Sequence, residues 1–269
     1  MVKLLHPELS YKVRGVLLDV YNVLGPMLKE VYYRDAIVLG LEKRGIACVP
    51  EKRFEVYYEA ERVGLYYVDV WVDGGKILLE LKVASAIESI HKAQAISYLK
   101  VTDADLAIVV NYGSSSLDDE RLPNFLRDRQ PEFVWHPQPV ARDLLYPDLV
   151  NAVQRACYRV HFGLGPGFLH QVYRRATLIE LRRSGLNYDY IKQLPVAYAN
   201  QLLGYQDVRL VRVEGKVLLA TFALGGTDGT RSMALVEQLK AHLRRVGLKL
   251  GLLANFYGTG LEITPVRVK

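Results

Sequence analysis

The chain has 269 residues, of which 50% are hydrophobic and 24% are charged, and this composition excludes a disordered, low-complexity or disulfide-dependent miniature protein. No apolar run approaches the ~18 residues of a membrane helix and the N-terminus does not resemble a signal peptide, so we expect a cytoplasmic protein with no membrane partner. The net charge of +6 is uneven, because residues 1–140 hold 17 Lys and Arg against 20 Asp and Glu (−3), whereas the remaining residues hold 18 against 9 (+9).

The first half of the chain predicts two helices, three strands, a further helix and a strand, in that order. Apolar residues recur with helical spacing, and Gly25-Pro26 separates the first helix from the second, since proline suits the first turn of a helix. Asp73-Gly74-Gly75 is typical of a hairpin turn between two strands. The expected helices are 9–23, 27–44 and 86–100, and the expected strands are 52–59, 64–72, 76–84 and 105–112.

A linker is predicted next, within residues 113–145. The segment opens with Gly113 and three serines and is rich in Asp, Arg and Pro, which is a composition typical of loops. Phe133-Val134-Trp135 inside this segment is a candidate for the last strand of the first domain. Residues 261–264 would then be its counterpart at the end of the second domain.

The second half of the sequence repeats the first. Leu24-Gly25-Pro26 and Tyr33 recur 140 residues later, as Leu164-Gly165-Pro166 and Tyr173. At an offset of 144, the residues Gln94, Leu99, Leu106 and Asn111 recur as Gln238, Leu243, Leu250 and Asn255. The elements of the second half are expected at 147–162, 167–184, 192–199, 207–213, 216–223, 231–246 and 248–256.

The duplication predicts two tandem domains, 1–140 and 146–269. Each is expected to be an α/β domain in which a mixed β-sheet is flanked by helices, in the element order ααβββαβ. A single chain with two such domains resembles a symmetric dimer of one-domain subunits. We therefore expect either a monomer that mimics a dimer through its two repeats, or a homodimer.

Two strands of the first repeat carry charged side chains among apolar ones. Residues i and i+2 share a face of a strand, so Glu80 and Lys82 project together, and the hairpin places Asp69 opposite Glu80. The two carboxylates and the main-chain carbonyl of Leu81 are the kind of oxygen ligands that Mg²⁺ or Mn²⁺ prefers. Such a cation activates water, and Lys82 would orient that water or neutralise developing charge, which favours phosphodiester hydrolysis. The alternative is a salt bridge between Glu80 and Lys82 on an exposed strand.

Two helices offer further polar side chains. Glu30 and Tyr33 share one face of the second helix, and His91, Gln94 and Tyr98 share one face of the third. The alternatives are a solvated glutamate near a helix N-terminus and a partly exposed amphipathic helix. The tyrosine pairs at 57–58 and 66–67 are mostly strand formers, of which one or two could stack on bases of a single strand.

Together these residues resemble the PD-(D/E)XK nuclease superfamily, and more closely the GxxExxY family within it. The resemblance covers nearly the whole of each repeat, and it departs at Met27, where the motif has Gly. It implies Asp69 and Glu80 as ligands of a divalent metal and Lys82 as the catalytic lysine. It further implies Glu30 and Gln94 as residues of the catalytic site. The accessory residues would be Tyr33, His91 and Tyr98, and the remaining matches are Leu24-Gly25-Pro26 and Asn111-Tyr112.

The second repeat keeps the framework and loses the acidic residues. Leu210 stands where the strand aspartate is expected, Ala220-Thr221-Phe222 replaces Glu-Leu-Lys, and His170 replaces the motif glutamate. We therefore predict that the second domain is catalytically inactive. Its arginines would hold nucleic acid for the first domain, since Arg suits phosphate well; the alternative is a scaffold that replaces a partner subunit. The candidate nucleic-acid-binding residues are Arg174, Arg175, Arg182, Arg183, Arg244 and Arg245.

The sequence thus favours a divalent-metal-dependent nuclease that hydrolyses the phosphodiester bonds of DNA or RNA, with DNA preferred as the partner. The active site would lie in the first repeat, and Mg²⁺ or Mn²⁺ would be the cofactor. The alternative is a non-catalytic module that binds nucleic acid or a protein and retains a vestigial site. A third interpretation is hydrolysis of another phosphate ester.

Overall fold

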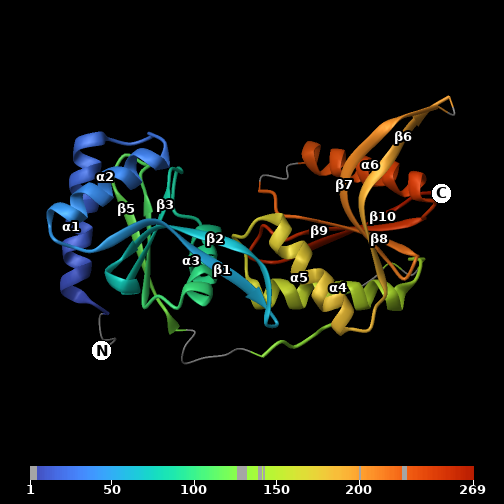
Figure 1. The fold of residues 1–269 in the computed structure, drawn as a ribbon, viewed down its shortest axis with the longest axis horizontal. Coiled ribbons are helices and arrows are strands. Elements are labelled where there is room, and N and C mark those ends of the chain that lie inside the picture. Colours follow the sequence, from blue (N-terminus) through green and yellow to red (C-terminus); the bar gives the residue numbers. More distant parts are fainter. Residues whose placement is uncertain (1–4, 126–131, 139–140, 142, 200, 226–228) are drawn as a thin grey trace. The chain divides into compact units, whose positions relative to one another are not determined.

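The computed structural model describes residues 5–125, 132–138, 141, 143–199, 201–225 and 229–269. The chain forms two compact units, which are drawn in Figure 1. The first unit comprises Met1–Tyr57 and Gly64–Glu132, and the second comprises Tyr58–Val63 and Phe133–Lys269. In the described part of the chain, no helix is long and apolar enough to cross a membrane.

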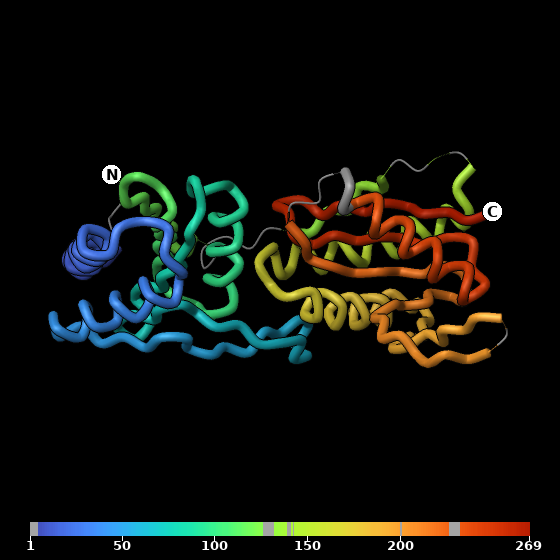
Figure 2. The backbone as a smooth tube through the Cα atoms, turned by 90° about the horizontal axis from the view of Figure 1, so that it is seen from above, coloured from blue at the N-terminus to red at the C-terminus, as the bar shows by residue number. Residues whose placement is uncertain are grey.

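The first unit contains a mixed five-stranded sheet with helices on both faces (Figures 1 and 2). The strand order is β1-β2-β3-β4-β5, in which β3 and β4 are parallel while β2–β3 and β4–β5 are antiparallel. The elements are α1 (Pro7–Leu24), α2 (Glu30–Lys43), β1 (Cys48–Tyr58), β2 (Glu61–Val72), β3 (Ile77–Lys82), α3 (Ser89–Thr102), β4 (Leu106–Asn111) and β5 (Asp118–Pro123).

Strand β3 separates an apolar face of the first sheet from a polar one. Leu79 and Leu81 belong to the core that the sheet forms with α1 and α2, together with Leu17 and Ile37. Alternation along a strand therefore directs Glu80 to the opposite face, on the side of α3. The central strand β3 thus carries a core face and a candidate functional face, as the i, i+2 pattern predicts.

The second unit has the same element order and sheet topology. Its strand order is β10-β9-β8-β7-β6, with β8 and β9 parallel and the other neighbours antiparallel. The predicted fold class, an α/β protein with two mixed sheets flanked by helices, is confirmed. The elements are α4 (Pro147–Leu164), α5 (His170–Arg183), β6 (Tyr188–Tyr198), β7 (Gln201–Val213), β8 (Val217–Phe222), α6 (Gly229–Val246), β9 (Leu250–Asn255) and β10 (Glu262–Arg267).

The fifth strand of the first sheet differs from the sequence prediction. It is β5, with Asp119 paired to Val110, and not Phe133-Val134-Trp135, which forms no strand. β5 is a charged edge strand without apolar alternation, so its sequence is typical of a loop, although charged residues are common at sheet edges. Phe133 and Trp135 instead contact aromatic rings of α4 in the second unit. The counterpart predicted at 261–264 lies at the start of β10.

The second helix of each repeat begins three residues after the predicted position, because a tyrosine closes the loop before it. The Tyr33 hydroxyl accepts a hydrogen bond from the Leu28 N–H (3.0 Å) and donates one to the Gly25 carbonyl (2.7 Å). Tyr33 is fully buried and stacks on Tyr112, with ring centroids 4.1 Å apart. Tyr173 makes the same pair of bonds in the second repeat. The tyrosine of the motif therefore shapes the loop in both repeats.

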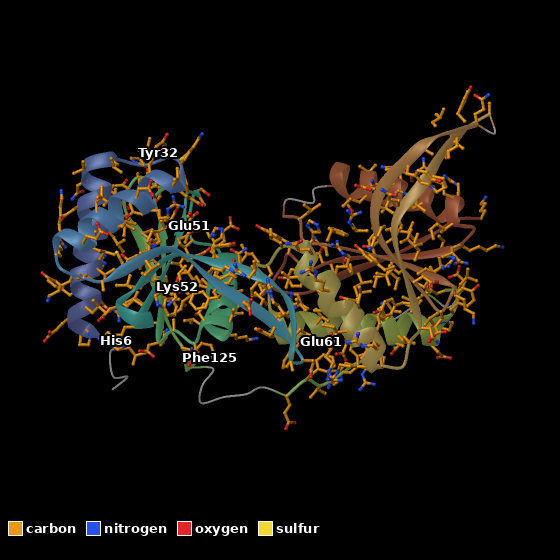
Figure 3. All side chains as sticks on the ribbon, viewed as in Figure 1. His6, Tyr32, Glu51, Lys52, Glu61 and Phe125 are labelled. Carbon is orange, nitrogen blue, oxygen red and sulfur yellow. The ribbon has the colours of Figure 1, made fainter. Side chains whose placement is uncertain are left out.

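We expect Tyr33→Phe to destabilise the protein by about 1–3 kcal/mol, because the Leu28 N–H and the Gly25 carbonyl both lose their hydroxyl partner. Urea unfolding monitored by circular dichroism measures this change. Tyr32→Phe is the matched control, since Tyr32 is 56% exposed on the same helix (Figure 3) and should leave the midpoint unchanged. Equal midpoints for both variants would contradict a loop-closing role for Tyr33.

Met27 lies in this loop and has a left-handed backbone conformation, with φ of 68°. The equivalent residue of the second repeat is Gly167, with φ of 108°. Glycine adopts positive φ without the steric penalty that a side chain brings. The departure at Met27 therefore keeps the loop geometry and adds local strain, and the Met27 N–H still donates to the Tyr112 carbonyl (3.0 Å).

Candidate active site

The candidate site forms where β2 separates from β3. The two strands pair at Val70–Leu79, Trp71–Leu78 and Val72–Ile77. At the next position, Asp69 Oδ2 accepts a hydrogen bond from the Leu81 N–H, at 2.8 Å. A side chain thus takes the hydrogen bond that a continuing ladder would give to the main chain, and this places the carboxylate beside β3.

Glu80 is held from two directions and is only 5% exposed. Its Oε1 accepts a hydrogen bond from Lys82 Nζ and its Oε2 accepts one from the Tyr66 hydroxyl, each at 2.8 Å. The side chains of Lys82 and Glu80 are 19% and 7% exposed. The Glu80–Lys82 ion pair therefore exists, but it lies on a buried strand rather than on an exposed one.

The charges of the site act strongly on Asp69. Burial and then repulsion from Glu80 raise the pKa of the Asp69 carboxyl to about 7, against the opposing effects of the Leu81 N–H and of Lys82. Burial by itself would lower the pKa of Lys82, but Glu80 and the weaker fields of Glu30 and Asp69 more than reverse this and raise it. Two close carboxylates with one lysine thus leave unbalanced negative charge.

A divalent cation fits this donor set. In the described residues, no group of three or more His, Cys, Asp or Glu side chains is placed to hold a metal ion, so Asp69 and Glu80 would need other ligands. The N–H and C=O of a strand residue point toward the same neighbouring strand. Since the Leu81 N–H points to Asp69, the Leu81 carbonyl also lies on that side. Mg²⁺ is commonly held by one or two carboxylates and several waters, which this set allows.

We expect Asp69→Asn to stabilise the metal-free protein at pH 8 by at most about 4 kcal/mol, since one pKa unit corresponds to ~1.36 kcal/mol. The folded-state pKa of Asp69 is raised from 3.8 to about 7, so the folded state binds more protons and stability falls as pH rises through this window. Thermal unfolding in EDTA between pH 4 and 8 measures the difference. Asp35→Asn, at an exposed position of α2, is the control, and parallel profiles for both variants would contradict the prediction.

Of the other predicted site residues, Glu30 and His91 interact electrostatically with the charges of the site. Glu30 is exposed at the start of α2, and its charge acts on both Asp69 and Lys82. On α3, burial and the charge of Lys82 lower the pKa of His91, whose Nδ1 also accepts the Glu88 N–H at 3.1 Å. Gln94 lies on α3 one turn after His91 and is partly buried.

Tyr66, which the sequence offered only as a strand former or as a residue that stacks on bases, contacts the site. Its hydroxyl donates to Glu80, and its ring stacks on Tyr98 with centroids 3.8 Å apart. Burial and the charge of Glu80 raise its pKa well above the ordinary tyrosine value, so it acts as a hydrogen-bond donor. Strict alternation places residues 66 and 69 on opposite faces, and this is why the pattern missed it. Tyr98, predicted as accessory, is buried and supports this ring.

The second unit has apolar residues at the equivalent positions. Strands β7 and β8 pair one position further than β2 and β3, with Leu210 opposite Ala220. These two residues correspond to Asp69 and Glu80, and Phe222 corresponds to Lys82. The register therefore agrees with the sequence alignment of the repeats at this point.

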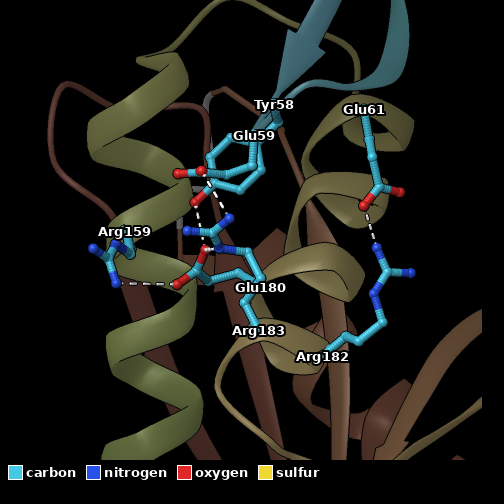
Figure 4. Close-up of polar contacts among 7 residues, drawn as sticks. All are labelled: Tyr58, Glu59, Glu61, Arg159, Glu180, Arg182 and Arg183. Carbon is cyan, nitrogen blue, oxygen red and sulfur yellow. Dashed lines mark hydrogen bonds and ion pairs between the residues drawn. The ribbon is translucent and has the colours of Figure 1, made fainter.

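The candidate nucleic-acid-binding arginines differ in exposure and in their partners. Arg174 is 8% exposed, with its guanidinium 5.7 Å from the centre of the Tyr190 ring. Arg182 and Arg183 form ion pairs with Glu61 and Glu59 (Figure 4). Arg175 donates to the Val63 carbonyl, whereas Arg244 and Arg245 are exposed on α6. Of the four α5 arginines, Arg174 is buried, whereas the other three are exposed and two of those form ion pairs, so their contact with phosphates stays a prediction.

In the first unit, an aspartate on one strand and a Glu-x-Lys pair on the next converge on one face of a mixed sheet. A family model of the PD-(D/E)XK nuclease superfamily matches residues 7–122 and 147–265. The chain belongs to this superfamily, and both repeats carry it.

No curated protein matches the chain in sequence. A solved structure titled "Crystal structure of SSO0001" is similar, with 17% identity, a TM-score of 0.26 and coverage of 44% of this chain. The chain spans 61% of the length of that structure.

Proposed function

We propose that the first repeat, within residues 1–140, hydrolyses phosphodiester bonds of DNA or RNA, with DNA preferred, in a reaction that needs Mg²⁺ or Mn²⁺. The observation that carries this proposal is the convergence of Asp69, Glu80 and Lys82 at the point where β2 leaves β3. Membership of the superfamily supports it. The finer resemblance to the GxxExxY family belongs to the same proposal and rests on the spacing from Glu30 to Tyr98.

Each residue of the site has a distinct task in this proposal. Asp69 and Glu80, with the Leu81 carbonyl, would hold the cation, which when bound supplies positive charge that acidifies water and stabilises phosphate. Lys82 orients the attacking water or neutralises negative charge that develops on the phosphate. Tyr66 fixes the Glu80 carboxylate in place by its hydrogen bond. Glu30, His91 and Gln94 would complete the site, while Tyr33 and Tyr98 would support it through packing.

A substrate panel tests the proposal directly. The purified protein is incubated with labelled single- and double-stranded DNA and RNA, with Mg²⁺, Mn²⁺ or EDTA. Cleavage that needs the metal supports the nuclease and identifies its polymer. Cleavage of small phosphodiesters alone would indicate another phosphate ester as substrate. Binding without cleavage on any polymer would favour a non-catalytic module with a vestigial site.

For the second repeat, within residues 146–269, we propose a catalytically inactive domain that holds nucleic acid through α6. Leu210, Ala220 and Phe222 replace the ionic residues of the first site. Asp207 lines the same cavity but lies three positions before Leu210 and already pairs with Gln193 and Arg209, so the carboxylate pair of the first site has no equivalent here. Arg244 and Arg245 remain exposed on α6. The competing proposal is a scaffold that stands in for a partner subunit and makes no phosphate contact.

We expect the double variant Arg244→Ala/Arg245→Ala to weaken nucleic-acid binding and to reduce the slope of log affinity against log salt by about 1–2, because each phosphate contact releases counterions. Fluorescence anisotropy measures the binding affinity at salt concentrations between about 50 and 300 mM. Arg182→Ala/Arg183→Ala is a matched control from the same unit, where both arginines already pair with glutamates. An unchanged slope in the α6 variant would leave the scaffold as the better proposal.

A further inference from the structure

The two repeats contain equivalent long hairpins, and the tip of one hairpin is buried whereas the tip of the other is exposed. The first tip, Tyr58–Val63 between β1 and β2, belongs to the second unit. The second tip comprises the large side chains around the turn between β6 and β7: Tyr198, Leu202, Leu203 and Tyr205. The offset of 140 pairs Tyr58 with Tyr198 and Val63 with Leu203. Tyr58 and Val63 are 6% and 0% exposed, whereas Tyr198 and Leu203 are 77% and 67% exposed.

The first tip is seated on helices α4 and α5 by specific contacts. The Tyr58 hydroxyl donates to Glu180 at 2.9 Å, and Glu180 is only 2% exposed (Figure 4). The Tyr58 ring lies so close to Gly163 that a Cβ there would be 3.1 Å from a ring carbon. Arg175 donates to the Val63 carbonyl at 3.2 Å. A helix pair of this fold is therefore a receiving surface for a hairpin tip of this fold.

The second tip is open to solvent in the described part of the chain. Figure 1 shows β6 and β7 extending beyond the rest of their sheet. Leu202 and Tyr205 are also 56% and 65% exposed, so four large side chains around this turn are open to solvent. Exposed apolar groups that cluster in this way mark an interaction site in a soluble protein.

The helices of the first unit carry a groove with a volume of about 560 Å³ along α1, adjacent to the positions equivalent to the seat of the first tip. We name it the α1 groove, and its lining residues are Tyr11, Lys12, Arg14, Gly15, Leu18 and Arg44. Four of these six have equivalents in the cavity of the second unit that includes Arg159, Glu180 and Arg183, the residues around the first tip. The four equivalents are Asn151, Ala152, Arg155 and Ser184. Tyr11 is 81% exposed at the groove.

At one of the two ion pairs of the first tip, the charges of tip and surface both differ between the repeats. Glu59 and Glu61 of the first tip pair with Arg183 and Arg182. Their equivalents in the second tip are Ala199 and Gln201, and the equivalents of Arg183 and Arg182 on the first unit are Lys43 and Glu42. An acidic second tip would meet Glu42 with a repulsive like charge, and the neutral tip does not.

We propose that the second tip docks in the α1 groove of a second copy of this chain. The contact joins two different surfaces, so it is heterologous, and each copy keeps one free tip and one free groove. Assembly therefore proceeds head to tail and increases with protein concentration. The proposal is independent of the nuclease activity.

Sedimentation velocity of the 269-residue chain, at protein concentrations between about 1 and 200 μM, tests the proposal. We expect wild type to shift to larger species with concentration. The tip variant Leu203→Glu/Tyr205→Glu and the groove variant Tyr11→Glu should each remain monomeric, with at least a tenfold weaker association. Met233→Glu, at a 66% exposed position of α6, is the control and should assemble like wild type. Circular dichroism checks that each variant folds.

Mixing the two variants gives the sharpest result. The tip variant retains an intact groove and the groove variant retains an intact tip, so an equimolar mixture should form a one-to-one dimer that grows no further. A groove variant that assembles like wild type would overturn the proposal in favour of tip-to-tip contact. Wild type that stays monomeric to the highest concentration would overturn it as well, and loss of nucleic-acid binding in the tip variant would then assign the tip to that ligand.

Discussion

Replacing Lys82 by alanine is expected to lower metal-dependent cleavage by about 10²–10³-fold, the range observed when one stabilising group is removed from a transition state. Lys82 Nζ lies 2.8 Å from Glu80 Oε1 on a strand that is otherwise buried. Its charge is therefore fixed beside the two carboxylates before substrate arrives. Initial cleavage rates at saturating Mn²⁺ on the polymer that wild type cleaves measure the loss.

Lys76→Ala is the matched control for this experiment. Lys76 lies in the turn that joins β2 to β3 and pairs with Asp73 at 2.7 Å, so the variant removes a lysine from the same hairpin outside the site. It should cleave as wild type does. Isothermal titration with Mn²⁺ separates the roles further, since Asp69→Ala should lose the metal whereas Lys82→Ala should retain it. Undiminished cleavage by Lys82→Ala would remove Lys82 from the proposed chemistry.

Replacing Glu180 by alanine is expected to destabilise the protein by about 1–3 kcal/mol, the cost of leaving the buried Tyr58 hydroxyl without its acceptor. Glu180 accepts the Tyr58 hydroxyl at 2.9 Å and lies 3.5 Å from Arg159 and 3.8 Å from Arg183. Without it, the buried hydroxyl lacks an acceptor and Arg159 loses its counter-charge, whereas Arg183 keeps Glu59 at 2.9 Å. Urea unfolding of the full-length chain measures the change.

Two further variants define the origin of this effect. Glu42→Ala removes an exposed glutamate from α2 and should change stability by less than about 0.5 kcal/mol, as surface substitutions usually do. Tyr58→Phe should cost about 1–2 kcal/mol, and in combination with Glu180→Ala it should add almost nothing, because both remove the same bond. Additive losses would show that Tyr58 and Glu180 contribute independently.

The sequence determined those features that depend on neighbours along the chain. The duplication, the α/β class and the face shared by Glu80 and Lys82 follow from periodicities and from one hairpin turn. Asp69 could be placed beside Glu80 for the same reason, since a tight turn fixes the register of the two strands it joins. The equivalence of Leu210 and Ala220 to this pair follows in the same way, and the strand register agrees with it.

Only the tertiary structure decided contacts between residues far apart in sequence. Tyr66 hydrogen-bonds to Glu80, although strict alternation along β2 places Tyr66 on the face opposite to Asp69. No local sequence pattern predicts this contact. The charged strand β5 is a strand because it pairs with β4. The Tyr33 hydroxyl reaches the Gly25 carbonyl only when the loop between α1 and α2 has folded back on α2. Arg182 appeared free in the sequence because its partner Glu61 lies 121 residues away. Periodicity in the sequence predicts which face of a helix or strand a side chain occupies. The residue that it contacts on that face depends on how the elements pack, and this packing is defined only in the folded chain.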